Sequence, residues 1–278
     1  MIGQNLRLIG WLGVMTLGAA TLTAQKSYDL SPAQIDDIVQ KFAAKEAAFA
    51  KAREAYTYRQ SARIQELDEG GAIMGRWETI SDIVFSQDGK RSEKVVRSPV
   101  PTLRNITLTP EDLEDMRSVQ PFVLTTAELS KYLIRYLGHQ NVDEIGTFVF
   151  AVKPKKIEGN QRYFAGQVWV DDRDLQIVKS YGRGVGNVSR KGDNQFPKFE
   201  TYREQIDGKY WFPTYTVAND TLHFQSGDQR IRQTIRYEDY KQFGAETKIT
   251  FGDEVKDETK PATPAPPKPP APAKPPAK

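Results

Sequence analysis

Residues 166–183 read GQVWVDDRDLQIVKSYGR, and this stretch decides the fold. Apolar and polar residues alternate on both sides of four charged residues, Asp171-Asp172-Arg173-Asp174. Alternation with a period of two is typical of β-strands, and aspartate side chains accept hydrogen bonds from nearby backbone N–H groups in turns. The stretch therefore predicts two antiparallel strands joined by a charged turn. A calcium loop is the alternative, but the central glycine and the closing glutamate of such a loop are missing.

The same two-residue period continues through most of the chain from Tyr56 onwards. Several segments are separated by the pairs Gly70-Gly71, Asp88-Gly89 and Asp207-Gly208, which are typical of hairpin connections. Consecutive strands that are joined by tight turns, without helices between them, predict an antiparallel meander. The predicted strands are 56–68, 72–87, 91–98, 145–154, 161–171, 175–183, 196–207, 209–219 and 229–243.

A long amphipathic helix is predicted before the first strand. Ser31 is its expected N-cap, Pro32 takes the first helical position and Gln34 completes a capping box. Apolar residues then recur at helical spacing on one face for about six turns, so the helix must pack on an apolar surface. These residues are Ile35, Ile38, Phe42 and Phe49.

The meander is interrupted between residues 109 and 138. Thr109 is an N-cap candidate with acidic residues in the turn that follows, which favours a short helix. Residues 125–138 form a second helix that ends at Gly138, or else a strand, because residues 131–136 also alternate. The predicted fold class is α+β: a curved antiparallel half-barrel sheet of about nine to eleven strands, with a long N-terminal helix and a helical insertion.

Both ends of the chain differ in composition from the middle. Residues 1–24 carry one arginine, an apolar run and then small residues, a pattern that predicts a secretory signal peptide. Residues 257–278 are rich in proline and lysine, so a disordered tail is expected there. The domain is therefore expected to span residues 25–256, and the protein is expected in the periplasm.

The composition excludes several classes of function. The chain has no cysteine, which rules out disulfides, thiolate catalysis and thiolate metal sites. Removing Arg7 and the four lysines of the C-terminal segment from the formal charge of +3 leaves about −2, so a nucleic-acid partner is not predicted. The two histidines, His139 and His223, lie far apart without partners at metal-ligand spacing. We therefore predict neither a metal nor a cofactor, and no enzymatic activity.

Strand faces identify candidate ligand-binding residues. In residues 229–239, isoleucines alternate with arginines, so one face of that strand is dry and the other is wet. One helix and a short insertion do not fill the concave side of a sheet with about nine strands, and curled sheets of this size enclose side chains or a ligand. Aromatic and branched residues are expected to line this space; the alternative is that they only fill the core. They are Ile73, Trp77, Phe85, Tyr163, Trp169, Trp211, Ile231 and Ile235.

Two motifs resemble a known group of proteins. VWVD (168–171), followed by a charged turn and LQIVK (175–179), is similar to a hairpin of the periplasmic lipoprotein-carrier superfamily, which includes the LolA/LolB-type and RseB-like proteins. DGKYWFPTYT (207–216) resembles a later hairpin of the same group. The resemblance spans residues 31–251 in the order of elements and implies a half-open barrel with a hydrophobic cavity. No catalytic residue carries over.

The resemblance and the strand faces together predict non-enzymatic binding of an acyl chain, a lipid or a lipidated protein, as a carrier or chaperone. The alternative is an RseB-like envelope sensor, or an interaction module that binds a protein partner through the same sheet.

Overall fold

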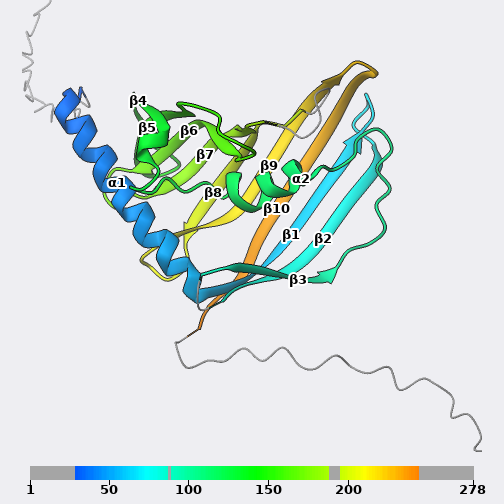
Figure 1. Cartoon of the computed structure of the whole chain (residues 1–278), viewed down its shortest axis with the longest axis horizontal. Helices are drawn as coiled ribbons and strands as arrows, with labels where there is room; N and C mark the ends of the chain where they lie inside the picture. The colour runs from blue at the N-terminus through cyan, green and yellow to red at the C-terminus, as the bar shows by residue number, and fades with distance from the viewer. Residues whose placement is uncertain (1–28, 87–88, 188–194, 244–278) are drawn as a thin grey trace, which may run out of the picture. The chain divides into compact units, whose positions relative to one another are not determined.

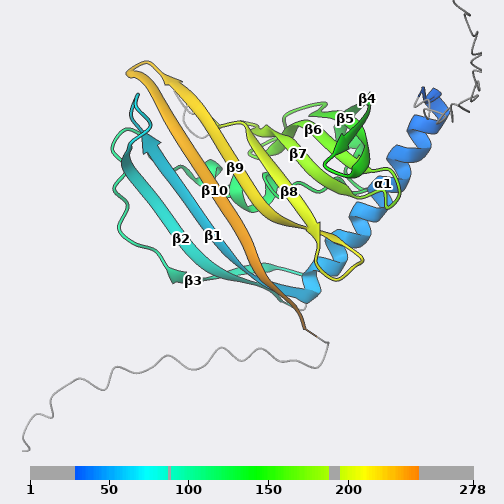
Figure 2. The same cartoon turned by 180° about the vertical axis from the view of Figure 1, so that it is seen from behind.

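The computed structural model describes residues 29–86, 89–187 and 195–243. All of them except Phe243 belong to one compact unit. Ten strands form a single open antiparallel sheet in the order β3-β2-β1-β10-β9-β8-β7-β6-β5-β4 (Figures 1 and 2). The predicted fold class is confirmed. The strands are β1 (Tyr56–Leu67), β2 (Ile73–Phe85), β3 (Arg91–Arg97), β4 (Tyr132–Val142), β5 (Ile145–Pro154), β6 (Tyr163–Asp171), β7 (Ile177–Val185), β8 (Phe199–Gln205), β9 (Trp211–Phe224) and β10 (Gly227–Gln242).

The topology has one unusual connection. β1 to β3 form one meander and β4 to β10 form another, and the two meanders join where β1 pairs with β10. β3 and β4 consequently lie at opposite edges of the sheet, although they follow each other in the chain. Residues 98–131, which we name the crossing segment, must therefore pass from one edge to the other across a face of the sheet (Figure 1).

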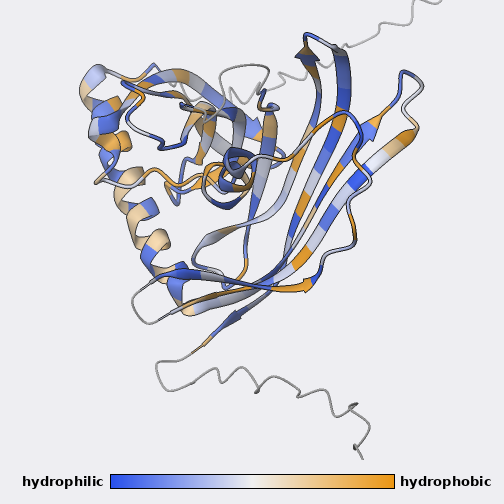
Figure 3. Ribbon diagram, turned by 45° about the vertical axis from the view of Figure 1, so that its right-hand side comes forward, coloured by the Kyte–Doolittle hydropathy of each residue, from blue (hydrophilic) through white to orange (hydrophobic). Residues whose placement is uncertain are grey.

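A row of directly paired residues runs through nine strands and defines the covered face of the sheet. All residues of this row are buried except the one at each end. Because directly paired residues point to the same side of a sheet, these residues mark the inner face. The alternation along each strand also appears in the hydropathy of the long strands (Figure 3). The row consists of Tyr136, Phe150, Val168, Ser180, Thr201, Thr216, Ile235, Ala62 and Thr79.

Helix α1 (Pro32–Ala52) begins as predicted. The Ser31 hydroxyl accepts a hydrogen bond from the Gln34 backbone N–H, and the Gln34 side chain bonds back to the Ser31 N–H. The apolar stripe covers the inner face of β5 to β8, where the Phe42 and Phe150 rings lie 5.4 Å apart. A single turn, η1 (Arg53–Ala55), connects α1 to β1. Among the described residues, no helix is long and apolar enough to cross a membrane.

The charged stretch after β6 is a turn, as predicted. Asp171 Oδ1 accepts hydrogen bonds from the backbone N–H groups of Arg173 (2.6 Å) and Asp174 (2.9 Å). Leu175 takes a positive φ of 54°, which closes the turn before β7. Within the described ranges, no group of three or more metal-ligating side chains is found.

The interruption after β3 contains one short α-helix and does not contain the second helix that was one of two alternatives for residues 125–138. Thr109 caps α2 (Pro110–Glu114), and Asp112 completes the capping box. A π turn, η2 (Asp115–Val119), continues the helix, and one 3₁₀ turn, η3 (Leu129–Lys131), precedes β4. Residues 132–142 are a strand, so the strand alternative holds. The predicted signal peptide and tail lie outside the described residues.

Candidate functional site

The crossing segment is first attached to the sheet by a buried carboxylate. Glu66 on β1 accepts hydrogen bonds from three consecutive backbone N–H groups, those of Arg104 (2.8 Å), Asn105 (2.7 Å) and Ile106 (2.8 Å). Its neighbour Gly75 has to be a glycine, because a Cβ there would lie 2.7 Å from Glu66 Oε2 and 2.5 Å from the Thr102 carbonyl oxygen. The start of the crossing segment is thus held by polar bonds and by a close backbone approach.

A second attachment is a buried ion pair. Asp115, in η2, binds Arg162 through two hydrogen bonds of 2.8 and 2.6 Å. Burial raises the pKa of Asp115 to about 6, against the opposing effect of the hydrogen bonds and charge of Arg162. Gly184 on β7 leaves room for this carboxylate, because a Cβ there would lie 1.8 Å from Asp115 Oδ2.

The alternating glycines of YGRGVGN (181–187) are explained by the same close packing. Gly182 and Gly184 lie within β7, and Gly182 pairs with Gly166 of β6. A Cβ on Gly182 would lie 2.7 Å from the ring of Phe164. Glycine at every second position of a strand removes the side chains from one face, and here that face receives an aromatic ring and a carboxylate. This spacing was the signal available in the sequence.

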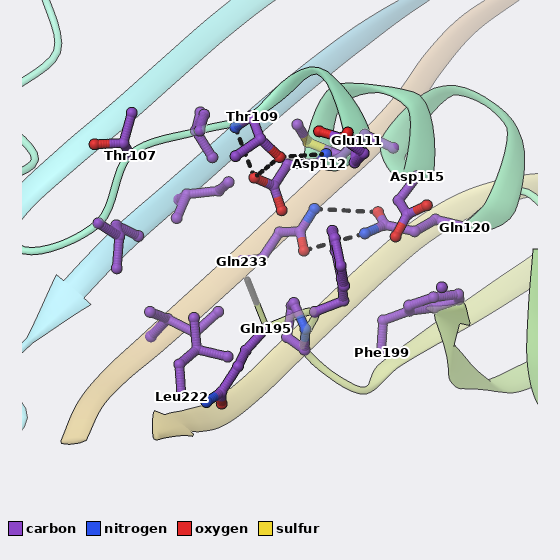
Figure 4. Close-up of a pocket in the computed structure, with 18 of the residues that line it drawn as sticks. Thr107, Thr109, Glu111, Asp112, Asp115, Gln120, Gln195, Phe199, Leu222 and Gln233 are labelled. Carbon is purple, nitrogen blue, oxygen red and sulfur yellow. Dashed lines mark hydrogen bonds between the residues drawn. The ribbon is translucent and has the colours of Figure 1, made fainter. Parts of the chain in front are cut away.

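The third attachment joins the end of the π turn to the middle of the sheet. The side-chain amides of Gln120 and Gln233 exchange two hydrogen bonds of 3.1 Å (Figure 4). The Thr201 hydroxyl donates to the Gln120 carbonyl oxygen (2.8 Å), and the Arg203 guanidinium donates to the Phe122 carbonyl oxygen. Arg203 is itself paired with Glu46 of α1 at 3.1 Å. Polar groups that are buried at this depth are stable only when they are bonded in this way.

An apolar pocket of about 610 Å³ lies between the crossing segment and the inner face (Figure 4). Its walls come from the sheet on one side and from residues 105–120 on the other, with polar groups of α2 at the rim. Pockets of this size and character hold small apolar ligands. The apolar lining residues are Ile64, Leu222, Phe224, Ile231, Phe196 and Phe199 on the sheet side, and Ile106, Leu108 and Met116 above them.

Four of the eight ligand-binding residues predicted from the sequence lie in or beside the apolar pocket or a second cavity next to it. Ile231 lines the apolar pocket. Ile235 is fully buried below Met116, and Trp77 packs against the same cluster. Phe85 lines a second cavity on the other side of the crossing segment.

The other four lie elsewhere. Tyr163 is buried in the core under α1. Trp169 shares the outer face with Lys179, whose Nζ is 5.2 Å from the Trp169 ring, and the Trp211 indole donates to Asp174 Oδ2 (3.2 Å) at the charged turn. Ile73 is 54% exposed, because an irregularity in the pairing of β1 with β2 places it opposite Leu67, on the face of Arg230. A ligand-binding role for these eight residues stays a prediction.

The sequence interpretation missed most of the pocket. Ile106 and Leu108 alternate with threonines in ITLT (106–109), but this stretch belongs to no strand, so its alternation was not assigned to a face. Leu222 lies on β9 beyond the predicted end of that strand at residue 219. The alternation in residues 106–109 and the apolar Leu222 are both visible in the sequence, but neither shows which surface the side chains face.

Comparisons with known proteins give distant structural matches. A LolA-superfamily protein from Nitrosomonas europaea is 13% identical, with 75% of this chain and 93% of that chain covered and a TM-score of 0.35. A DUF1329-family protein from Desulfovibrio piger is 16% identical, covering 75% and 95%, with a TM-score of 0.39. MucB is 14% identical, covering 74% and 93%, with a TM-score of 0.26.

The first of these comes from the superfamily that the two hairpin motifs resemble. A scan against family models finds no match, and a search of the curated proteins finds none either. Since the TM-scores are low, the function is argued below from the site alone.

Proposed function

We propose that the protein binds an acyl chain, either free, in a lipid or on a lipidated protein, in the apolar pocket under the crossing segment. It would act without enzymatic chemistry, as a carrier or chaperone in the periplasm. The observation that carries this proposal is the pocket itself, which has an apolar floor on β1, β9 and β10 and an apolar roof at Ile106, Leu108 and Met116.

Burial of methylene groups supplies the affinity. At about 0.8 kcal/mol for each buried methylene, a chain of about twelve carbons contributes on the order of 10 kcal/mol before the costs of ordering it. The hydrogen-bonding groups at the rim would then set the position of the chain. The crossing segment would form the cover of this pocket, and polar contacts at Glu66, Asp115 and Gln120 hold it over the inner face.

A steric block tests this proposal. Leu222→Trp places a larger side chain in the pocket, whereas Leu133→Trp makes a similar change on β4, where Leu133 is 49% exposed. The L222W protein is expected to lose at least tenfold in affinity for a fluorescent fatty acid, and L133W is expected to bind as the wild type does. Mass spectrometry of lipids extracted with the protein from its native envelope is expected to find an acyl ligand. Equal binding by both variants, or protein that is always empty, would contradict the proposal.

A second candidate function rests on the outer face. Trp169, Lys179, Tyr202, Tyr215 and Arg236 form one row of directly paired residues across β6 to β10. The cations lie against the rings, with Lys179 Nζ 4.9 Å from the Tyr202 ring and Arg236 Cζ 5.5 Å from the Tyr215 ring. Tryptophan, tyrosine and arginine are enriched at the centres of protein interfaces.

This row favours an envelope protein partner, as the sensor alternative requires. Tyr202→Ala together with Tyr215→Ala is expected to abolish capture of that partner from envelope extract, while fatty-acid binding is unchanged. Capture that persists in this double variant would exclude the row as the interface.

A further inference from the structure

The second cavity lies on the other side of the crossing segment and has a volume of about 850 Å³. Its walls come from the C-terminal end of α1, from β1 to β3, from residues 117–132, from residues 160–164 and from the ends of β9 and β10. We name it the arginine cavity, because four arginines from four different parts of the chain line it. They are Arg53, Arg91, Arg117 and Arg162.

The carboxylates of the cavity wall do not match these arginines one to one. Glu93 is shared, since its Oε2 is 3.1 Å from Arg91 Nη1 and 3.6 Å from Arg117 Nε. Glu114 accepts a hydrogen bond from the Ser118 hydroxyl at the exposed surface, and Glu128 lies near Tyr132. None of the three binds Arg53.

Arg53 is the one arginine of this cavity wall without a counter-charge among the described residues. Among the described residues, its guanidinium makes no hydrogen bond and no ion pair, and its one specific contact is with the Phe49 ring, 6.0 Å away. The nearby Glu46 is already bound to Arg203. Burial is the main influence that lowers the pKa of Arg53. The Arg53 side chain is half-buried, and an anion beside a cation that is partly withdrawn from water is stabilising.

Two arginines of the cavity wall also carry covered donors without a partner. Arg91 Nε and Arg162 Nη1 are buried and have no hydrogen-bond partner among the described residues. Arg91 also lies against Tyr58, whose ring stacks on Tyr240 at 5.1 Å, and both tyrosines are neighbours of Arg53. Buried guanidinium N–H groups are rarely left unbonded in proteins.

We infer that the arginine cavity binds an oxyanion, a carboxylate or a phosphate carried on an apolar body, with Arg53 holding the oxygens and with Arg91 and Arg117 adding positive charge to the wall. The rings of Phe49, Tyr58 and Tyr240 would contact the apolar part. Free phosphate and the headgroup of an amphiphile share this chemistry, and the aromatic walls favour the amphiphile. The site is separate from the apolar pocket, because the two cavities share no lining residue.

Calorimetric titration of the full chain with dodecyl phosphate, dodecanol and inorganic phosphate tests this inference. We compare Arg53→Gln with Arg232→Gln, which removes the same charge from an exposed position on β10. R53Q is expected to weaken dodecyl phosphate binding by roughly tenfold to a hundredfold, the effect of losing one hydrogen bond to a charged group. Dodecanol binding is expected to stay unchanged in R53Q, and R232Q is expected to behave as the wild type does.

Arg53→Lys and thermal melting guard against a variant that only misfolds. R53K keeps the charge without the planar fork and is expected to bind dodecyl phosphate with intermediate affinity. Dodecyl phosphate is expected to raise the melting temperature of the wild type but not that of R53Q. If inorganic phosphate binds as tightly as dodecyl phosphate, the apolar body is not part of the ligand and the amphiphile assignment falls.

The failure of this inference can be told apart from failure of the acyl-chain proposal. Equal dodecyl phosphate affinity in the wild type and R53Q, or an equal loss in R232Q, overturns the oxyanion site whatever L222W does. Conversely, fatty-acid binding that is unaffected by L222W overturns the acyl pocket and leaves the R53Q result intact.

Discussion

The two halves of the inner face are covered in different ways. Under α1, the sheet from β5 to β8 is filled by interlocking rings and branched side chains, among them Phe42, Phe150 and Phe164. Under the crossing segment, the sheet around β1, β9 and β10 keeps a pocket of about 610 Å³. A helix of 21 residues presents a continuous apolar stripe, whereas a five-residue helix in an extended connection cannot. Close packing is the rule in protein interiors, so the hollow half is the part suited to a ligand.

The largest expected effect tests the filled half directly. Phe150→Ala removes a fully buried ring beneath α1 and is expected to lower the free energy of unfolding by about 3–5 kcal/mol. Met116→Ala, beside the existing pocket, is expected to cost about 2 kcal/mol, because its neighbours are less tightly packed. Urea unfolding of both variants measures this difference. Equal losses would mean that the two halves are packed alike.

The ion pair between the halves gives a pH dependence. The pKa of Asp115, raised by burial to about 6 from the ordinary 3.8, means that the folded state holds this proton more tightly than the unfolded state does. The contribution to stability is therefore complete below about pH 4 and is lost as the pH rises through about 6. Relative to Asp115→Asn, the wild type is expected to lose up to about 3 kcal/mol between pH 4 and pH 7. Unfolding curves at both pH values measure this loss, and parallel behaviour of the two proteins would contradict it.

The anchor at the start of the crossing segment is expected to have a slightly smaller effect. Glu66→Gln removes the charge that three backbone N–H groups share and is expected to cost about 2 kcal/mol. Hydrogen exchange of residues 104–106 should become faster, while exchange in α1 is unchanged. Glu238→Gln, at an exposed position on β10, is the matched control and should leave both regions unchanged.

The smallest expected effect concerns the glycine that makes room for the ion pair. Gly184→Ala forces the Asp115 carboxylate to move, at a cost of about 1–2 kcal/mol. Gly70→Ala is the control, because the nearest atom to a Cβ there is 3.4 Å away. If G184A and G70A have the same stability and the same fatty-acid affinity, the glycine has no role in seating the crossing segment.

Much of the fold could be predicted because it is encoded locally. The period of two in residues 229–239 gives the correct faces for Ile231 and Arg230, and the capping residues Ser31 and Thr109 begin both α-helices. The candidate site could be predicted only in small part. Of the eight proposed lining residues, Ile231 reaches the apolar pocket, whereas Ile73 is turned outward by a local irregularity in strand pairing. Apolarity shows that a side chain needs cover, but it does not show what covers it.

By itself, the sequence determined the long helix, the charged turn at residues 171–174, the existence of most strands and the faces of residues 229–239, because each depends on interactions between residues close together in the chain. Only the tertiary structure decided where the crossing segment lies and which cavities it leaves on its two sides. β3 and β4 stand at opposite edges of the sheet, so their connection has to pass over the inner face. Its attachments join residues far apart in sequence, such as Glu66 with Asn105 and Gln120 with Gln233, and such pairs leave no local pattern.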